Sequence, residues 1–186
     1  TMSTIFPAVR AVGEGKGETI FYLTAKTITR TVAQEAFEVL REKGMKYKVV
    51  TMTAKEKLCF MDETKCDPVH CPYARGHFDR VNDAVYELWT MKSRYDRETI
   101  REQAEKWQVC PFEMCLDLSV WVDAVICDYN YVFDPTVHLK RFFGEGAGGD
   151  YIFLIDEAHN LAERGREMYS ASICREDAVR VRKDIP

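Results

Sequence analysis

The stretch Tyr151-Ile152-Phe153-Leu154-Ile155-Asp156-Glu157-Ala158-His159 decides the fold class of this 186-residue chain. Five consecutive apolar residues predict a strand that is buried on both faces, as in a parallel sheet flanked by helices. Asp156 and Glu157 follow at the carboxyl end of this strand, where open α/β sheets bind their ligands. Acidic side chains there can hold Mg²⁺ and orient a water molecule against a nucleotide phosphate. The alternative is an ordinary helix start, with Asp156 as a cap and Glu157 in solvent.

Composition is that of a soluble globular protein, with 46% hydrophobic and 30% charged residues. No apolar run approaches the roughly 20 residues of a membrane span. The N-terminus carries no basic-then-apolar signal segment, so we expect a cytoplasmic protein without a membrane partner. Seven cysteines in such a chain predict metal or cluster ligation and buried thiols rather than disulfides.

The net charge of −4 argues against a broadly basic nucleic-acid binder, but the charge is unevenly distributed. Residues 1–57 carry a net +4, residues 58–110 carry −2 and residues 111–186 carry −6. Contacts to a phosphate backbone are therefore expected on the first third of the chain. Uneven solvated charge explains the same asymmetry equally well.

The first 57 residues read as a strand–helix–strand crossover. A short helix over residues 3–12 precedes a strand over 18–24, which is rich in β-branched and aromatic residues. A helix from Thr29 or Thr31 to about Lys43 follows, and a second strand occupies 47–53. The glycine-rich segment 13–17 is not a Walker A loop, because Lys16 is followed by Gly17 rather than Ser or Thr.

Hydroxyl side chains cluster where the first of these strands ends. Small hydroxyls and backbone N–H groups at a helix start suit phosphate oxygens, so we take this cluster as a candidate nucleic-acid contact. The alternative is that the threonines only cap the helix. The candidate residues are Thr24, Lys26, Thr27 and Thr29.

Residues 58–110 interrupt the α/β pattern and carry four cysteines with the spacing C-x6-C-x4-C-x38-C, namely Cys59, Cys66, Cys71 and Cys110. The segment is turn-rich around the two central cysteines, and helices are predicted over 78–91 and 97–106. Its apolar content is too small for a stable domain of its own, which makes a metal staple physically plausible.

The identity of the bound metal depends on spacing. Structural zinc sites usually show paired C-x2-C knuckles, which are absent here, whereas irregular spacing and a distant Cys110-Pro111 suit a [4Fe–4S] cluster. Zinc bound by cysteines with His70 or His77 stays open, as do unligated thiols. Cys115 repeats the x4 spacing from Cys110 and could replace Cys59 as a ligand.

The α/β pattern resumes after Cys110. A helix is predicted over 111–120, a strand within 121–129 that makes Cys127 an inert core residue, and a short helix over 138–143. A glycine-rich loop leads to the acidic strand. A helix then runs to about Met168, followed by a short extended segment over 169–173 and a helix over 174–183.

Four segments, in order, resemble the iron–sulfur DNA helicases of superfamily 2, the XPD/DinG (Rad3-like) family. The segment Leu23–Thr27 is similar to the family's motif Ia, and the four-cysteine region to its cluster domain. Residues 127–131 resemble the segment that follows that domain, and Asp156-Glu157-Ala158-His159 resembles motif II, the Walker B or DEAH box. The resemblance favours Cys59 over Cys115 as a ligand.

The resemblance implies a partial RecA-like parallel sheet of the P-loop NTPase type, interrupted by a small, mainly helical cluster insert. Residues 1–57 and 111–170 would form the first motor domain, 58–110 the insert and 171–186 the start of a truncated arch domain. The Walker A loop, motifs III to VI and the second motor domain have no counterpart in the sequence. Thr1 stands where the family's phosphate loop ends, so it would contact nucleotide.

The same resemblance implies the roles of the site residues. Asp156 would hold Mg²⁺, Glu157 would orient the attacking water at ATP, and His159 would couple nucleotide state to DNA. The threonine and lysine cluster would grip single-stranded DNA near a junction with duplex, with 5′–3′ polarity and a structural [4Fe–4S] cluster. We expect the fragment alone to be inactive. The alternatives are a metal-binding nucleic-acid adaptor without a motor and a zinc-stapled scaffold.

Overall fold

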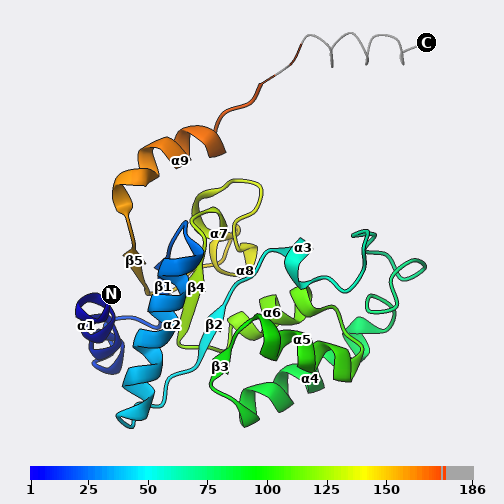
Figure 1. Cartoon of the computed structure of the whole chain (residues 1–186), viewed down its shortest axis with the longest axis horizontal. Helices are drawn as coiled ribbons and strands as arrows, with labels where there is room; N and C mark the ends of the chain where they lie inside the picture. Colours follow the sequence, from blue (N-terminus) through cyan, green and yellow to red (C-terminus); the bar gives the residue numbers. More distant parts are fainter. Residues whose placement is uncertain (173, 175–186) are drawn as a thin grey trace.

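The computed structural model describes residues 1–172 and residue 174, and these residues form an α/β fold around one five-stranded sheet (Figure 1). All strand pairs are parallel and the strand order is β3-β2-β4-β1-β5. The predicted fold class, a parallel RecA-like sheet with helices, is therefore confirmed. The strands are β1 (Thr19–Leu23), β2 (Val49–Thr51), β3 (Arg94–Tyr95), β4 (Ala124–Cys127) and β5 (Tyr151–Ile155).

Helices cover both faces of the sheet because successive strand residues point to opposite sides. Ile20 and Tyr22 of β1 pack into one core with α1 (Met2–Gly13) and α2 (Thr27–Glu42). Phe21 and Leu23 of the same strand pack into a second core on the opposite face. That core is covered by α4 (His77–Met91), α5 (Arg97–Trp107) and α6 (Pro111–Ser119).

The helices of the cysteine-bearing insert therefore share a core with the sheet. Ile100 of α5 and Val81 of α4 lie in the same cluster as Val125 of β4. The two-residue strand β3, which the sequence did not predict, extends the sheet beyond β2 by pairing Arg94 with Val49. The insert obtains its apolar burial from the five-stranded sheet rather than from a core of its own.

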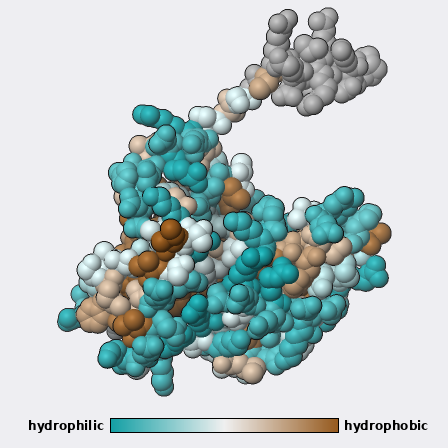
Figure 2. All heavy atoms as spheres, in the orientation of Figure 1, coloured by the Kyte–Doolittle hydropathy of each residue, from teal (hydrophilic) through white to brown (hydrophobic). Residues whose placement is uncertain are grey.

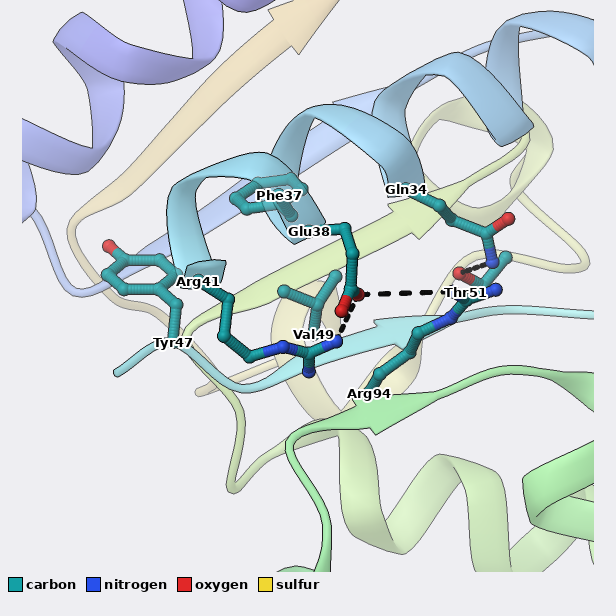
Figure 3. A pocket seen from close by; sticks show the side chains of 8 residues that line it. All are labelled: Gln34, Phe37, Glu38, Arg41, Tyr47, Val49, Thr51 and Arg94. Carbon is teal, nitrogen blue, oxygen red and sulfur yellow. Dashed lines mark hydrogen bonds and ion pairs between the residues drawn. The ribbon is translucent and has the colours of Figure 1, made fainter. Parts of the chain in front are cut away.

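A small pocket between α2 and the strands β2 and β3 shows how this junction is tied together (Figure 3). Glu38 of α2 lies between the guanidinium groups of Arg41 and Arg94, with Arg94 Nη1 3.9 Å from Glu38 Oε2. The Gln34 amide donates to the Thr51 hydroxyl at 2.8 Å. These side chains partner one another, so the pocket serves as a polar seam between the first strand crossover and the insert.

The strand β5 is where the structure differs most from expectation. The prediction of a strand buried on both faces was wrong: its side chains are only half-buried, and Phe153 is 41% exposed. The reason is its place in the sheet, since β5 pairs with β1 along one side and is the outermost strand of the described residues. Along the edge that pairs with β1 the strand is packed, because the Phe153 ring stacks on the Phe21 ring with their centres 5.5 Å apart.

Short helices complete the chain, and several of their bounds differ from those predicted. The helix α2 begins at Thr27, two residues before Thr29, because the backbone of Lys26 is still extended. Tyr169 forms the turn that ends the last described helix, so the predicted extended segment does not include Tyr169, and residues 170–172 belong to no helix or strand. The remaining helices are α3 (Lys55–Leu58), α7 (Asn130–Phe133), α8 (Lys140–Phe143), the 3₁₀ helix η1 (Ala158–Asn160) and α9 (Leu161–Met168).

The helix predicted over 174–183 lies outside the described residues, apart from Cys174.

Hydrophobic residues gather on the surface of α2, as the view of Figure 2 shows, and the exposed side chains of this helix include Ile28, Val32 and Val39. Within the described part of the chain, every helix is too short or too polar to cross a membrane.

Candidate nucleotide and thiol sites

Three strands end together at one edge of the sheet, and the predicted acidic pair lies there. The backbone N–H of Asp156 donates to the carbonyl of Leu23 at 2.9 Å, which fixes the end of β5 beside the end of β1. The N–H of Thr24 donates to the carbonyl of Cys127 at 3.0 Å, which fixes the end of β1 beside that of β4. The carboxyl edge of the sheet thus brings Thr24 and Asp156 into neighbouring positions, although 132 residues separate them in sequence.

Asp156 is held rigidly while part of its carboxylate stays unpaired. The Tyr129 hydroxyl donates a short hydrogen bond to the Asp156 backbone carbonyl, and Tyr129 itself has no exposed surface. The Oδ2 atom of Asp156 is buried and has no hydrogen-bond partner among the described residues. A buried carboxylate oxygen without a partner is costly unless another group satisfies it. This atom therefore fits a cation or its bound water.

Glu157 follows in a left-handed backbone conformation, with φ of 51°. Non-glycine residues rarely adopt this conformation and such strain is concentrated at functional sites. The turn directs the chain into η1, and the His159 Nδ1 lies 3.5 Å from the Glu157 Oε2. Both side chains remain accessible, with exposed fractions of 47% for Glu157 and 72% for His159.

Thr1 lies near the same edge. Burial raises the pKa of Tyr22 on β1, a hydrogen bond with Thr1 opposes that rise, and the charge of Asp156 adds to it. Thr1 and Asp156 therefore both lie close enough to Tyr22 to shift its pKa. These contacts put the first residue of the chain and the acidic pair in one neighbourhood.

The predicted phosphate-contact residues form a hydrogen-bonded turn between β1 and α2. The hydroxyls of Thr24 and Thr29 share a short hydrogen bond, and the Thr29 hydroxyl donates to the Lys26 carbonyl at 2.9 Å. Thr24 is buried, whereas Lys26 and Thr27 are exposed. Thr24 and Thr29 therefore hold the turn, and Lys26 and Thr27 present their side chains to solvent at the start of a 16-residue helix.

Sequence reasoning missed Arg164, which ties the acidic segment to the neighbouring strand end. From α9, its Nη2 donates to Asn130 Oδ1 at 3.1 Å and lies 3.5 Å from Asp128 Oδ1. Its Nη1 donates to Glu167 at 3.2 Å. The contact pattern links residues 34 and 36 positions apart, so no local sequence signal could have identified it.

The four predicted cysteine ligands line one hollow beside α3 and the N-terminus of α6. The hollow has a volume of about 30 Å³, and Phe60, Tyr73 and Phe112 are among its apolar lining residues. Cysteines from three separate segments therefore line the same hollow. The lining cysteines are Cys59, Cys66, Cys71 and Cys110.

Electrostatics distinguish two of these thiols. A hydrogen bond from Lys55 to Cys66 is the main reason that the pKa of Lys55 is raised. Burial raises the pKa of Cys110, while the backbone N–H groups of Glu113 and Phe112 at the start of α6 oppose that rise. An ammonium group and a helix N-terminus both favour a thiolate, as a ligand cysteine requires.

Arginines of α4 and α5 hold the walls of this thiol hollow. Arg101 donates to the carbonyls of Leu58 at 2.6 Å and Cys59 at 3.1 Å. Arg80 donates to the carbonyls of Trp107 at 3.0 Å and Gln108 at 2.6 Å. The segments that carry the first and the last cysteine are therefore fixed to the insert helices through backbone groups.

The alternative ligands lie elsewhere. Cys115 is fully buried, burial raises its pKa to about 12, and its sulfur contacts Met52 at 3.8 Å. His70 is exposed and binds Asp67 at 2.8 Å. His77 is buried, and its Nδ1 accepts the backbone N–H of Cys110 at 3.2 Å. The hollow is lined by Cys59 and by neither histidine among the described residues.

The spacing of the donors decides which group fits. In the part of the chain that the structure describes, no three His, Cys, Asp or Glu side chains lie close enough to hold a single metal ion. Zinc requires about 2.3 Å from each sulfur to one centre. A four-iron cluster accepts one thiolate at each of four irons, so its ligands stand farther apart. Four cysteines that line one hollow supply the type and number of donors that a [4Fe–4S] cluster uses.

Comparison with known proteins adds two findings. The family model DEAD_2 matches residues 24–178, which is more than four fifths of the chain. A stretch of 89 residues is 32% identical to the "Fanconi anemia group J protein homolog" of Gallus gallus. That stretch is 48% of this chain but only 6% of the chicken protein.

Proposed function

The chain belongs to the DEAD_2 family of superfamily 2 helicases, and we propose that it is part of the first motor domain of an ATP-dependent DNA helicase with an iron–sulfur insert. The matched stretch covers only 6% of the chicken relative, so the activity of a whole helicase is part of the proposal. The observation that carries the proposal is the unpaired, buried Asp156 Oδ2 beside Glu157, at the edge where β1 and β5 end.

At this edge of the sheet, each residue would have a separate role in phosphoryl transfer. Mg²⁺, when bound, would neutralise charge on the phosphate oxygens. Asp156 would hold that ion, since its buried Oδ2 has no partner among the described residues. Glu157 would orient the attacking water and polarise it, as its accessible carboxylate follows directly on the fixed end of β5. His159, next to Glu157, would respond to its change of charge.

The DNA contacts would lie on the neighbouring strand end. Lys26 and Thr27 are exposed at the start of α2, where backbone N–H groups and the helix dipole favour phosphate. Thr24 and Thr29 would keep this turn in shape through their shared hydrogen bond. Because β1 lies between β4 and β5 in the sheet, a change at Asp156 would reach the DNA turn through adjacent backbone.

The thiol hollow would hold a [4Fe–4S] cluster through Cys59, Cys66, Cys71 and Cys110. The cluster would act as a structural staple, joining the loop after α3 to the start of α6. Lys55 would balance the negative charge of the thiolates, since Cys66 is the main cause of its raised pKa. Arg80 and Arg101 would keep the ligand-bearing backbone in place.

The proposal is tested by strand separation in the full-length protein. We expect the Glu157→Gln variant to bind ATP with the wild-type affinity and to lose unwinding of a duplex with a single-stranded tail. Glu163→Gln is a matched control, because Glu163 is an exposed carboxylate on α9. Normal unwinding by Glu157→Gln would refute the assignment and favour a metal-binding adaptor without a motor.

A further inference from the structure

A second hollow lies on the outer side of the insert, between α4 and the end of α6. It has a volume of about 470 Å³ and an aromatic floor made by Tyr86, Trp89 and Trp121. Tyr86 is 70% exposed and Trp121 is 65% exposed, which is unusual for such large rings. Adjacent exposed aromatic side chains of this kind mark interaction sites.

The charge of this aromatic hollow selects its ligand. Both charged residues that line it are aspartates, Asp83 of α4 and Asp117 of α6. Asp117 pairs with Arg141 at 2.6 Å, whereas Asp83 is exposed and forms no ion pair with any other described residue. The unpaired carboxylate of Asp83 would repel a phosphate backbone and attract an ammonium or guanidinium group.

One of the rings already accepts a cation within the chain. The Lys48 Nζ lies 4.3 Å from the centre of the Trp89 ring, and the Trp89 Nε1 donates to the Trp121 carbonyl at 2.8 Å. The floor is therefore held in a fixed orientation. The neighbouring faces of Tyr86 and Trp121 are exposed and offer a second cation the same kind of contact.

We propose that this aromatic hollow binds a basic segment of a partner protein, with a lysine or arginine side chain against Trp121 and Tyr86 and its charge paired with Asp83. The rings supply apolar contact for the side-chain stem, and Asp83 supplies the complementary charge. The site uses neither the acidic edge of the sheet nor the cysteine hollow, so this proposal does not depend on the helicase assignment.

The test uses the whole chain and a fluorescein-labelled 12-residue peptide that repeats Arg-Leu-Gly, with binding followed by fluorescence anisotropy. We expect saturable binding that weakens with salt and is absent for the matched Glu-Leu-Gly peptide. Asp83→Asn and Trp121→Ala should each weaken binding about three- to tenfold. Glu35→Gln removes an equally exposed carboxylate from α2 and should leave binding unchanged.

Several results would overturn the proposal. The first is no binding of the Arg-Leu-Gly peptide, and the second is an equal loss in Glu35→Gln and Asp83→Asn, which would indicate general attraction to an acidic protein. The third is binding of a thymidine 15-mer that Trp121→Ala abolishes, which would identify the rings as a platform for single-stranded DNA. Because Asp83 and Trp121 are both exposed, circular dichroism should show that each variant folds normally.

Discussion

Replacing Ile100 by alanine tests whether the insert and the sheet fold as one unit. Ile100 of α5 has no exposed surface and lies in the core that β1, β2 and β4 share with the insert helices. Removing its side chain should cost about 2–5 kcal/mol of unfolding free energy. With a urea dependence of about 2 kcal/mol per molar, the midpoint should fall by roughly 1–2.5 M.

The chain offers a convenient assay, because its three tryptophans, Trp89, Trp107 and Trp121, lie on or beside the insert helices. Their fluorescence reports on the insert, while far-ultraviolet circular dichroism reports on all helices. We expect both signals to shift together in Ile100→Ala. Ile28→Ala is the matched control, because Ile28 is 77% exposed and its loss should change stability by less than about 0.5 kcal/mol.

The reasoning would be refuted if tryptophan fluorescence changed at lower urea than circular dichroism in Ile100→Ala. Separate transitions would mean that the insert unfolds while the sheet stays folded, which a shared core does not permit. A drop below about 1 kcal/mol would equally contradict the burial of Ile100.

Three further predictions follow from individual contacts. Hydrogen bonds from Lys106, Trp107 and Gln103 lower the pKa of Glu87 from 4.5 to about 2, so its contribution to stability should be complete above about pH 4.5 and fade toward pH 2. Glu87→Gln should therefore flatten the loss of stability in acid, and an unchanged pH profile would count against this network. Cys71→Ser in anaerobically prepared full-length protein should lose bound iron and visible absorption, whereas Cys115→Ala should keep both; the reverse result would reassign the ligands. Tyr129→Phe should cost about 1 kcal/mol in urea unfolding, because it removes the hydrogen bond to the Asp156 carbonyl, and no change would show that bond to be unimportant.

Much of the fold could be read from local patterns. The strands β1, β2, β4 and β5 and the helices α4, α5 and α6 follow from apolar runs and helical spacing. The two-residue strand β3 could not be found this way, because its place is fixed by pairing with β2. The exposure of β5 could not be predicted from the sequence either, because an apolar run indicates a strand but does not show whether another strand pairs with each of its edges.

In the candidate sites, too, the sequence predicted the motifs but not the residues that support them through tertiary contacts. The Asp156-Glu157 pair was visible as a motif, and so were the four cysteines that line one hollow. Their supporting residues were not, because Arg164, Arg80 and Arg101 act through contacts that lie 27 to 43 positions apart in sequence. Spacing alone left open that Cys115 replaces Cys59, and only packing separates a lining thiol from a core thiol.

The most direct measurement is the rate of ATP hydrolysis by the full-length protein with saturating Mg²⁺, ATP and single-stranded DNA. If Glu157 orients and polarises the attacking water, Glu157→Gln should lower that rate about 10²- to 10⁴-fold, while Glu163→Gln leaves it unchanged. A rate within about threefold of wild type in Glu157→Gln would contradict the account, because the carboxylate at the end of β5 would then have no part in the chemistry.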